Sequence, residues 1–181
     1  MADLETLHRR ILAQVDELLA VAEDPGPFPE ARTRVSGWCA LEHAEHMARA
    51  DEASLHQLER ALERGRSGDA GRGITLAGRG ILALGWIPRG VGKSPEVSRP
   101  AGSERARVAA DLRAVRERTA ALGARLDELA AGRGRASHPF FGGLTPARWL
   151  RFLWVHHHHH LKIVRDVRAA FEAEARARPA A

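Results

Sequence analysis

Five consecutive histidines lie inside a segment whose apolar residues recur at helical spacing, from Trp149 to Phe171. A purification tag normally stands at a terminus beside a small polar linker, whereas this run is embedded in an amphipathic pattern. At about 100° per residue, the following residues share one direction: Trp149, Leu153, His156, His160, Ile163, Val167 and Phe171. His158 points nearly the opposite way, and His157 falls on the border between the two faces. The segment therefore predicts an amphipathic helix that buries His156 and His160 one turn apart.

Two imidazoles at this spacing can bind the same metal ion. A zinc site needs at least three protein ligands, so a facing helix has to supply another one. The segment WCALEHAEHM, residues 38–47, offers His43 and His46 on its uncharged side, and periodicity slightly favours His43. A chance homopolymer, or two core histidines that are hydrogen-bonded to neighbours, are the alternatives that spacing alone leaves open.

Three further stretches carry apolar residues at steps of three and four. The four predicted helices cover residues 3–22, 37–64, 103–131 and 145–177. Ser36 and Ser103 are the expected N-caps of the second and third helices, and Thr145 with Pro146 opens the fourth. No segment shows the alternation that is typical of a strand. The pattern predicts an all-α protein, a single domain over residues 1–181 that folds as an antiparallel four-helix bundle.

The second and third predicted helices are separated by residues 65–102, which are rich in glycine and apolar only around residues 74–87. We expect a long loop with one short helix over residues 74–84. A connection of this length usually serves as a functional lid or is disordered. Its segment IPRGVGKS, residues 87–94, resembles a phosphate-binding loop, but Ile87 stands where glycine is needed and Pro95 follows where a helix should begin. We therefore reject a phosphate-binding loop here.

Charge and cysteine content narrow the function classes. The net charge is +5, but the arginines are spread through every segment among acidic residues, and tyrosine is absent, which argues against a nucleic-acid-binding face. No apolar run reaches 18 residues, so no membrane span is expected. The charged segment Met1–Arg10 does not resemble a signal peptide, and a single cysteine, Cys39, fits a reducing compartment. We expect a cytoplasmic protein that can form a homodimer and that binds neither nucleic acid nor membrane.

Two regions resemble the DinB-like metal-binding four-helix bundles. One is W-x7-H followed by an apolar residue, from Trp38 to Met47, and the other is H-x3-H with HHL, from His156 to Leu161. HPFFGGLTPARWLRFLWVHHHHHLK, residues 138–162, further resembles the DUF1569-type branch through its HP-x-FG-x-LT-x3-W pattern. The resemblance covers most of the chain except the loop of residues 65–102. It implies a divalent metal ion, with zinc or nickel as candidates, bound by His46, His156 and His160.

The resemblance also implies a metal-dependent transferase or hydrolase that acts on a small molecule. Characterised relatives include thiol transferases that use low-molecular-weight thiols and a maleylpyruvate isomerase. Three neutral imidazoles with an open coordination position could polarise a thiol or a carbonyl group. A non-enzymatic stress-response or binding protein, in which the metal only staples the bundle, is the alternative. Such bundles often carry Arg-Gln after HHL, whereas this chain has Lys162-Ile163, so a role for that glutamine has no support.

Four other residues are candidates for supporting the site. His43 could donate a hydrogen bond to a ligand or act as a base, or it could be a plain buried histidine. His138 could line the mouth of a pocket, although stabilising the turn before the last helix fits it better. Glu42 could orient the His46 ring or lie exposed on the surface. His159 flanks the predicted ligands and could support them, whereas Cys39 fits the core.

Overall fold

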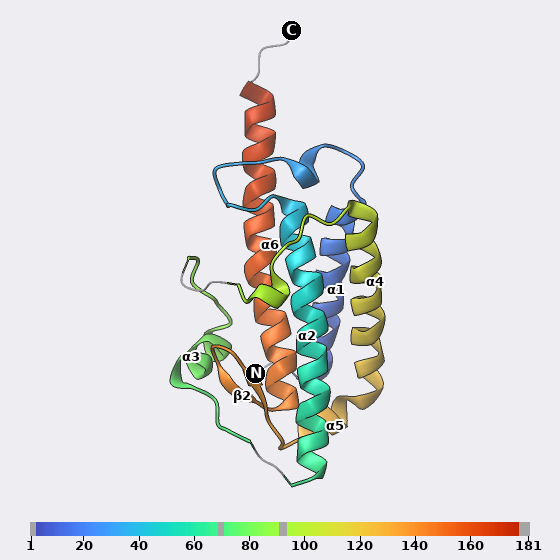
Figure 1. Cartoon of the computed structure of the whole chain (residues 1–181), viewed down its shortest axis with the longest axis vertical. Helices are drawn as coiled ribbons and strands as arrows, with labels where there is room; N and C mark the ends of the chain where they lie inside the picture. The colour runs from blue at the N-terminus through green and yellow to red at the C-terminus, as the bar shows by residue number, and fades with distance from the viewer. Residues whose placement is uncertain (1–2, 69–70, 91–93, 178–181) are drawn as a thin grey trace.

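Four long helices lie alongside one another and bury their apolar stripes between them. The computed structural model describes residues 3–68, 71–90 and 94–177. These helices are α1 (Leu4–Glu23), α2 (Ala40–Arg66), α4 (Arg105–Ala121) and α6 (Pro146–Ala177), shown in Figure 1. α1 packs against α4 and α6, and α2 packs against the same two helices. The described chain is mostly helical, as the sequence predicts.

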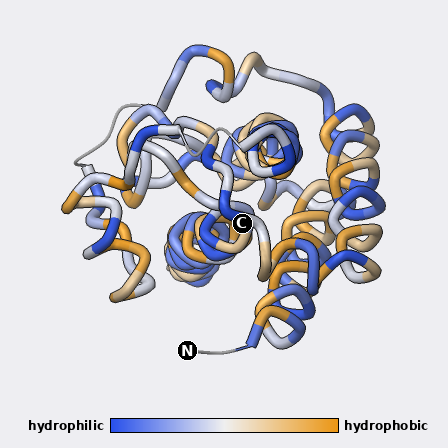
Figure 2. Tube along the Cα trace, turned by 90° about the horizontal axis from the view of Figure 1, so that it is seen from below, coloured by the Kyte–Doolittle hydropathy of each residue, from blue (hydrophilic) through white to orange (hydrophobic). Residues whose placement is uncertain are grey.

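The core contains the stripe residues of all four helices. Fully buried positions include Ile11, Val15, Leu18, Met47, Leu58, Leu112, Leu150, Leu153 and Val155. Figure 2, viewed along the long axis, shows hydrophobic and hydrophilic residues interleaved along every helix, which is the pattern of helices with one buried face. Among the described residues, no helix combines the length and apolarity that a membrane crossing requires.

Local hydrogen bonds move the start of the second helix away from the predicted position. α1 begins after Asp3, whose carboxylate accepts the N–H of Thr6 at 2.6 Å. α2 begins at Ala40 and not near residue 37, because the Glu42 carboxylate accepts the Cys39 N–H at 2.8 Å in a capping box. Ser36 is therefore not the N-cap. Its hydroxyl accepts the N–H of Trp38 at 3.1 Å instead.

The predicted continuous helix over residues 103–131 is interrupted. α4 ends at Ala121, a 3-10 turn follows over Leu122–Arg125, and α5 covers Leu126–Ala131. The Thr119 carbonyl, which in a continuous helix would accept the N–H four residues later, accepts the His8 ring Nε2–H at 2.8 Å. Ser103 is not the N-cap of α4, which begins after Glu104. Its hydroxyl donates to Glu45 at 2.7 Å.

A short hairpin precedes α6, and the expectation that the chain has no strand is wrong at this point. β1 (Ala136–His138) pairs antiparallel with β2 (Gly142–Leu144), with Ala136 opposite Leu144. Gly142 has a φ of +73°, and a Cβ at this position would lie 2.7 Å from the Gly73 carbonyl oxygen. Strands of three residues are too short to show the alternation on which a strand prediction depends.

The segment between α2 and α4 contains the expected short helix, α3 (Leu76–Leu84), which Figure 1 shows outside the long helices beside α6. Thr75 caps its start by accepting the Gly78 N–H at 3.0 Å, and Gly85 ends it at a φ of +70°. Three side chains of α6 hold this segment along the helix. Arg151 donates to the Leu82 carbonyl at 3.0 Å, His159 donates to the Ile87 carbonyl at 3.0 Å, and Asp166 pairs with Arg89 at 2.5 Å.

The end of the same connection is fixed on α2. Glu45 is buried and accepts the N–H groups of Ala101, Gly102 and Ser103. A 3-10 turn, η2 (Glu96–Ser98), packs against α2 just before this anchor. Of the rejected phosphate-loop segment, residues 91–93 lie outside the described residues. The described part after it, η2, is a three-residue turn and not the long helix that such a loop requires.

Candidate metal centre

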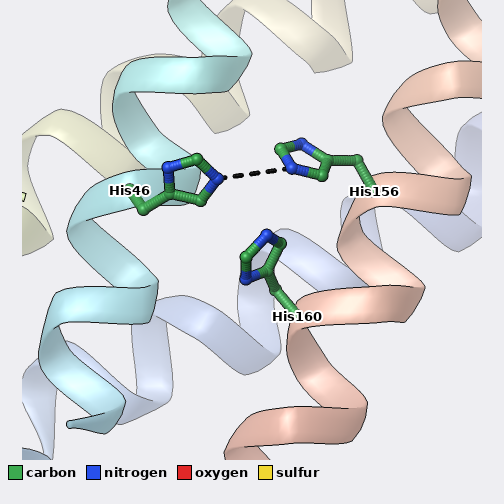
Figure 3. Close-up of side chains that lie close together, drawn as sticks. All are labelled: His46, His156 and His160. Atoms are coloured by element: carbon green, nitrogen blue, oxygen red, sulfur yellow. Dashed lines mark hydrogen bonds between the residues drawn. The ribbon is translucent and has the colours of Figure 1, made fainter. Parts of the chain in front are cut away.

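Three histidines from α2 and α6 converge on one point between the two helices. His46 projects from α2, and His156 and His160 project from α6, as Figure 3 shows. One ring nitrogen from each residue can be chosen so that all three lie within 4.8 Å of one another. The ring centroid of His160 lies 4.6 Å from that of His46 and 4.7 Å from that of His156. The structure thus brings together the three residues that the family resemblance implies as ligands.

The separation of the two closest nitrogens suits a shared ion. His46 Nε2 and His156 Nε2 are 3.3 Å apart, just beyond the usual 2.7–3.2 Å of a hydrogen bond with a nitrogen donor. Two nitrogens bound at about 2.0 Å to one tetrahedral zinc ion would lie roughly 3.3 Å apart. The residues present therefore fit a divalent ion with nitrogen ligands.

The proton of His46 is held on the ring nitrogen that faces away from the cluster. Its Nδ1 lies 2.6 Å from the Ser98 carbonyl oxygen, and the Ser94 hydroxyl lies 3.2 Å from the same nitrogen. A carbonyl oxygen can only accept, so Nδ1 carries the hydrogen and Nε2 presents its lone pair toward His156. A hydrogen bond of this kind orients a metal-binding imidazole in other proteins. Ser98 is 52 positions away from His46, so no local sequence pattern could have identified it.

His43 supports His160 and does not join the cluster itself. Its Nδ1 lies 3.0 Å from His160 Nδ1, and its Nε2 lies 2.9 Å from the Ser36 hydroxyl. This contact occupies Nδ1 of His160 and leaves the other ring nitrogen for the cluster. Periodicity slightly favours His43 over His46 as the ligand from α2, and the structure instead places His46 in the cluster.

Aromatic rings enclose the cluster. The Phe152 ring stacks on His156 with centroids 5.1 Å apart, and the Trp38 ring lies 5.1 Å from that of His46. Burial among these groups lowers the pKa of His156 and of His160 well below 6.5, and nearby histidines lower it further. Burial also lowers the pKa of His46, against the opposing effect of its bond to Ser98. All three rings are therefore neutral at pH 7 and carry the lone pairs that a metal ion needs.

His157 is buried, so its predicted position on the edge of the helix is wrong. Its side chain is 0% exposed, and Nε2 lies 2.6 Å from the Asp51 carboxylate of α2, which is 1% exposed. The cause is the width of the buried arc, because α6 packs against both α1 and α2. A second apolar stripe of Leu150, Leu161 and Val164 runs in the direction of His157 and could have revealed this. Asp51 gives a corresponding signal on α2, because it is an acidic residue that lies within the apolar stripe of that helix.

The other two histidines of the run have different environments. His158 is exposed and stacks on Trp154, with ring centroids 5.6 Å apart. His159 is half-buried, bonds to the Ile87 carbonyl, and places its ring centroid 4.9 Å from that of His160. The five consecutive histidines therefore divide into two cluster residues, one buried partner of Asp51, one surface residue and one residue at the edge of the cluster.

Neither Glu42 nor His138 contacts the three-histidine cluster through a hydrogen bond. The Glu42 carboxylate caps α2 and pairs with Arg32 at 2.6 and 2.8 Å, so it neither orients His46 nor lies free on the surface. His138 stabilises the hairpin turn, where its Nδ1 accepts the N–H groups of Phe140 and Phe141 at 3.2 and 3.3 Å. Phe152, at 4.5 Å from the His138 ring, lies between it and the cluster. Cys39 is buried at the start of α2, and burial raises the pKa of its thiol.

Because several histidines are buried, we expect the metal-free protein to lose stability in acid. Burial lowers the pKa of His138 to about 4, and that of His43 to about 4 with a further contribution from His46. Between pH 6.5 and 4 the unfolded chain binds these protons and the folded chain does not, so the free energy of unfolding falls as the pH falls, by up to roughly 1.4 kcal/mol per pH unit for each histidine. Urea unfolding in chelator at several pH values measures this slope.

A single substitution isolates the contribution of His138. In His138→Asn the amide oxygen can still accept the two turn N–H groups but does not titrate, so the slope between pH 6.5 and 4 should decrease by one histidine's share. The same change at the exposed His56 is the matched control for the loss of one imidazole. An unchanged slope in His138→Asn would show that the His138 ring is not kept neutral by burial.

Comparison with known proteins places the chain in a family. The family model described as the DinB superfamily matches residues 4–164, which include α1, α2, α4 and the histidine run of α6. Searches of curated proteins and of solved structures give no significant match. The match spans well over half of the chain and contains all three histidines of the cluster. The chain therefore belongs to the DinB superfamily.

Proposed function

We propose that the protein is a metal-dependent transferase or hydrolase that acts on a small molecule, with His46, His156 and His160 as the metal ligands. The observation that carries the proposal is the number of histidines in the cluster. Within the described part of the chain it gathers three neutral imidazoles, whereas structural zinc sites use four protein ligands and catalytic sites keep one position open. Zinc or nickel fits the nitrogen donor set, and a low-molecular-weight thiol is the proposed co-substrate.

The chain's own residues hold the ligands in place and limit access of water. The Ser98 carbonyl fixes the ring orientation of His46, and His43 does the same for His160. Trp38 and Phe152 cover two sides of the cluster with apolar surface. When bound, the metal ion supplies Lewis-acid polarisation and a coordination position for the substrate.

The scaffold that we propose is an antiparallel four-helix bundle of the DUF1569-type branch, in a single domain. The packing of α1 and α2 against both α4 and α6 supports the bundle, and the hairpin segment HPFFGGLT immediately before α6 supports the branch. The proposed activity needs no nucleic acid and no membrane. Surface arginines support this, since Arg105, Arg116 and Arg165 each pair with a carboxylate of another segment. Cytoplasmic location and formation of a homodimer are parts of the same proposal.

A stress-response or binding protein with a structural metal ion is the second candidate. The burial of His46 and His160, at 3% and 7% exposure, favours it, because a closed site that joins α2 to α6 would stabilise the fold. The two candidates differ in whether an external molecule reaches the ion.

Cobalt substitution distinguishes these functions. We expect that titration of the cobalt-loaded protein with a small thiol changes the visible spectrum, because an open position lets sulfur bind the ion directly. The measurement is the ligand-field and sulfur-to-cobalt absorption as a function of thiol concentration. A spectrum that stays fixed, in a protein that unfolds when a chelator removes the metal, would favour the structural site and contradict the enzymatic proposal.

A further inference from the structure

A pocket lies beside the histidine cluster, between α6 and the segment that follows α3. Its volume is about 270 Å³, and it is lined by Trp86, Ile87, Arg89, His158, His159 and Lys162. The bond from His159 to the Ile87 carbonyl and the ion pair between Arg89 and Asp166 hold its two walls together. His159 belongs both to the wall of this pocket and to the edge of the cluster, since its ring centroid lies 4.9 Å from that of His160.

The lining of the pocket is cationic and aromatic. Arg89 and Lys162 supply two positive charges, and the indole of Trp86, which is 54% exposed, supplies an apolar surface. The carboxylate nearest to Arg89 is that of Asp166, which is 47% exposed and bonds one nitrogen, Nη2, of the guanidinium. A guanidinium has five N–H donors, so Arg89 retains donors for a second anion.

We propose that this pocket binds an anionic group of the substrate, a carboxylate or a phosphate, while the reacting end of the same molecule reaches His46, His156 and His160. The proposal rests on the proposed function. Arginine binds such planar or tetrahedral anions through paired hydrogen bonds, and lysine adds a point charge. A substrate with one anionic end and one metal-seeking end would be oriented by the two sites together, and neutral analogues would lose that orientation.

Two thiols of equal length and different charge test the pocket. The cobalt-loaded protein is titrated at fixed ionic strength with 3-mercaptopropionate and with 3-mercapto-1-propanol, and the ratio of the two dissociation constants is measured. We expect Arg89→Gln to reduce the preference for the anionic thiol by about tenfold, the factor that corresponds to one charge-assisted hydrogen bond. Lys162→Gln should reduce it less, because lysine makes a weaker directional contact. The neutral thiol should bind equally well in all variants.

Asp166→Asn provides a change in the opposite direction. It removes the carboxylate that competes for Arg89, so the preference for the anionic thiol should increase severalfold. The matched controls are Arg107→Gln and Asp111→Asn, which break a comparable exposed pair on α4 with a distance of 3.0 Å. These controls change the net charge by the same amounts and should leave the preference as it is. A preference that is unchanged by Arg89→Gln, or that falls in Asp166→Asn, would overturn the proposal.

A metal-free arm separates failure of the pocket from failure of the proposed function. If neither thiol alters the cobalt spectrum, the enzymatic proposal fails, and the pocket is then tested alone with malonate and with inorganic phosphate. Binding is followed by the fluorescence of Trp86, assigned by comparison with Trp86→Phe. A response that requires Arg89 supports the pocket, and the stronger of the two anions identifies carboxylate or phosphate as the preferred group. A response that is identical in Arg89→Gln, or no response to either anion, contradicts the pocket.

Discussion

Replacing His46, His156 or His160 singly with alanine is expected to abolish tight, stoichiometric metal binding. Each change leaves two imidazoles at the cluster, and loss of a direct ligand should cost more than the roughly 10- to 100-fold in affinity that follows loss of a supporting hydrogen-bond partner. The measurement is bound metal per chain in tag-free protein after dialysis against a weak chelator. His43→Ala is expected to fall within that smaller range, because His43 contacts His160 and not the shared point.

The control is the exposed histidine within the same run. His158→Ala removes an imidazole without touching the cluster, since this ring stacks on Trp154 at the surface. Its metal content should equal that of the parent, and its stability should change by no more than about 0.5 kcal/mol, as is usual for a surface position. Equal losses at His158 and His156 would mean that the run binds metal as an exposed cluster, and the buried site would then be wrong.

Removing the carboxylate of Asp51 is expected to destabilise the protein by roughly 3–5 kcal/mol, the cost of breaking a buried, hydrogen-bonded pair. Asp51→Ala leaves the fully buried His157 without its partner between α2 and α6. Urea unfolding in the presence of chelator measures the effect on the fold without a contribution from metal binding. Glu52→Ala, at the neighbouring exposed acid that pairs with Arg118 on the surface, should cost about 0–1 kcal/mol.

A double substitution distinguishes the pair from ordinary packing. Asp51→Leu with His157→Leu replaces both polar groups by apolar ones of similar size, which is often close to neutral for a buried pair. We therefore expect the double variant to be more stable than the sum of the two single variants predicts. Additive losses would show that the two side chains do not interact, and a loss below 1 kcal/mol in Asp51→Ala would contradict the importance of the contact.

The helices and the two α6 histidines of the cluster could be predicted because both depend on periodicity. Apolar steps of three and four locate α1, α2 and α6 to within a few residues, although the helix predicted over residues 103–131 is broken after Ala121. The one-turn spacing of His156 and His160 places them on the same face. The choice of His46 over His43 needed the resemblance, because both lie in the same apolar arc of α2. In the structure both reach α6, but His46 meets His156 and His160 at one point, whereas His43 contacts only the far nitrogen of His160. No single-helix pattern contains this arrangement.

The predictions that differ from the structure concern positions where a contact between distant segments or a single hydrogen bond determines the local conformation. Ser36 and Cys39 are both acceptable near a helix start, and Glu42 decides between them through its bond to the Cys39 N–H. Periodicity places His157 at an edge only if α6 has a single narrow buried face, whereas α6 packs against both α1 and α2. The Ser98 carbonyl could not be foreseen, since a backbone group in a loop leaves no mark in the sequence.

The groups that hold the cluster are all uncharged, and this determines the net charge that a bound ion would retain. The His46 ring contacts the Ser98 carbonyl and the Ser94 hydroxyl, and the His160 ring contacts the neutral ring of His43. In many zinc proteins a carboxylate in this supporting position shares part of the ion's charge. A divalent ion held here would have no hydrogen-bonded carboxylate to share its charge, and the buried carboxylate of Asp51, which bonds His157, acts on His46 only through space. Such a centre favours an anionic molecule, a thiolate or a carboxylate, at its open position over a neutral one.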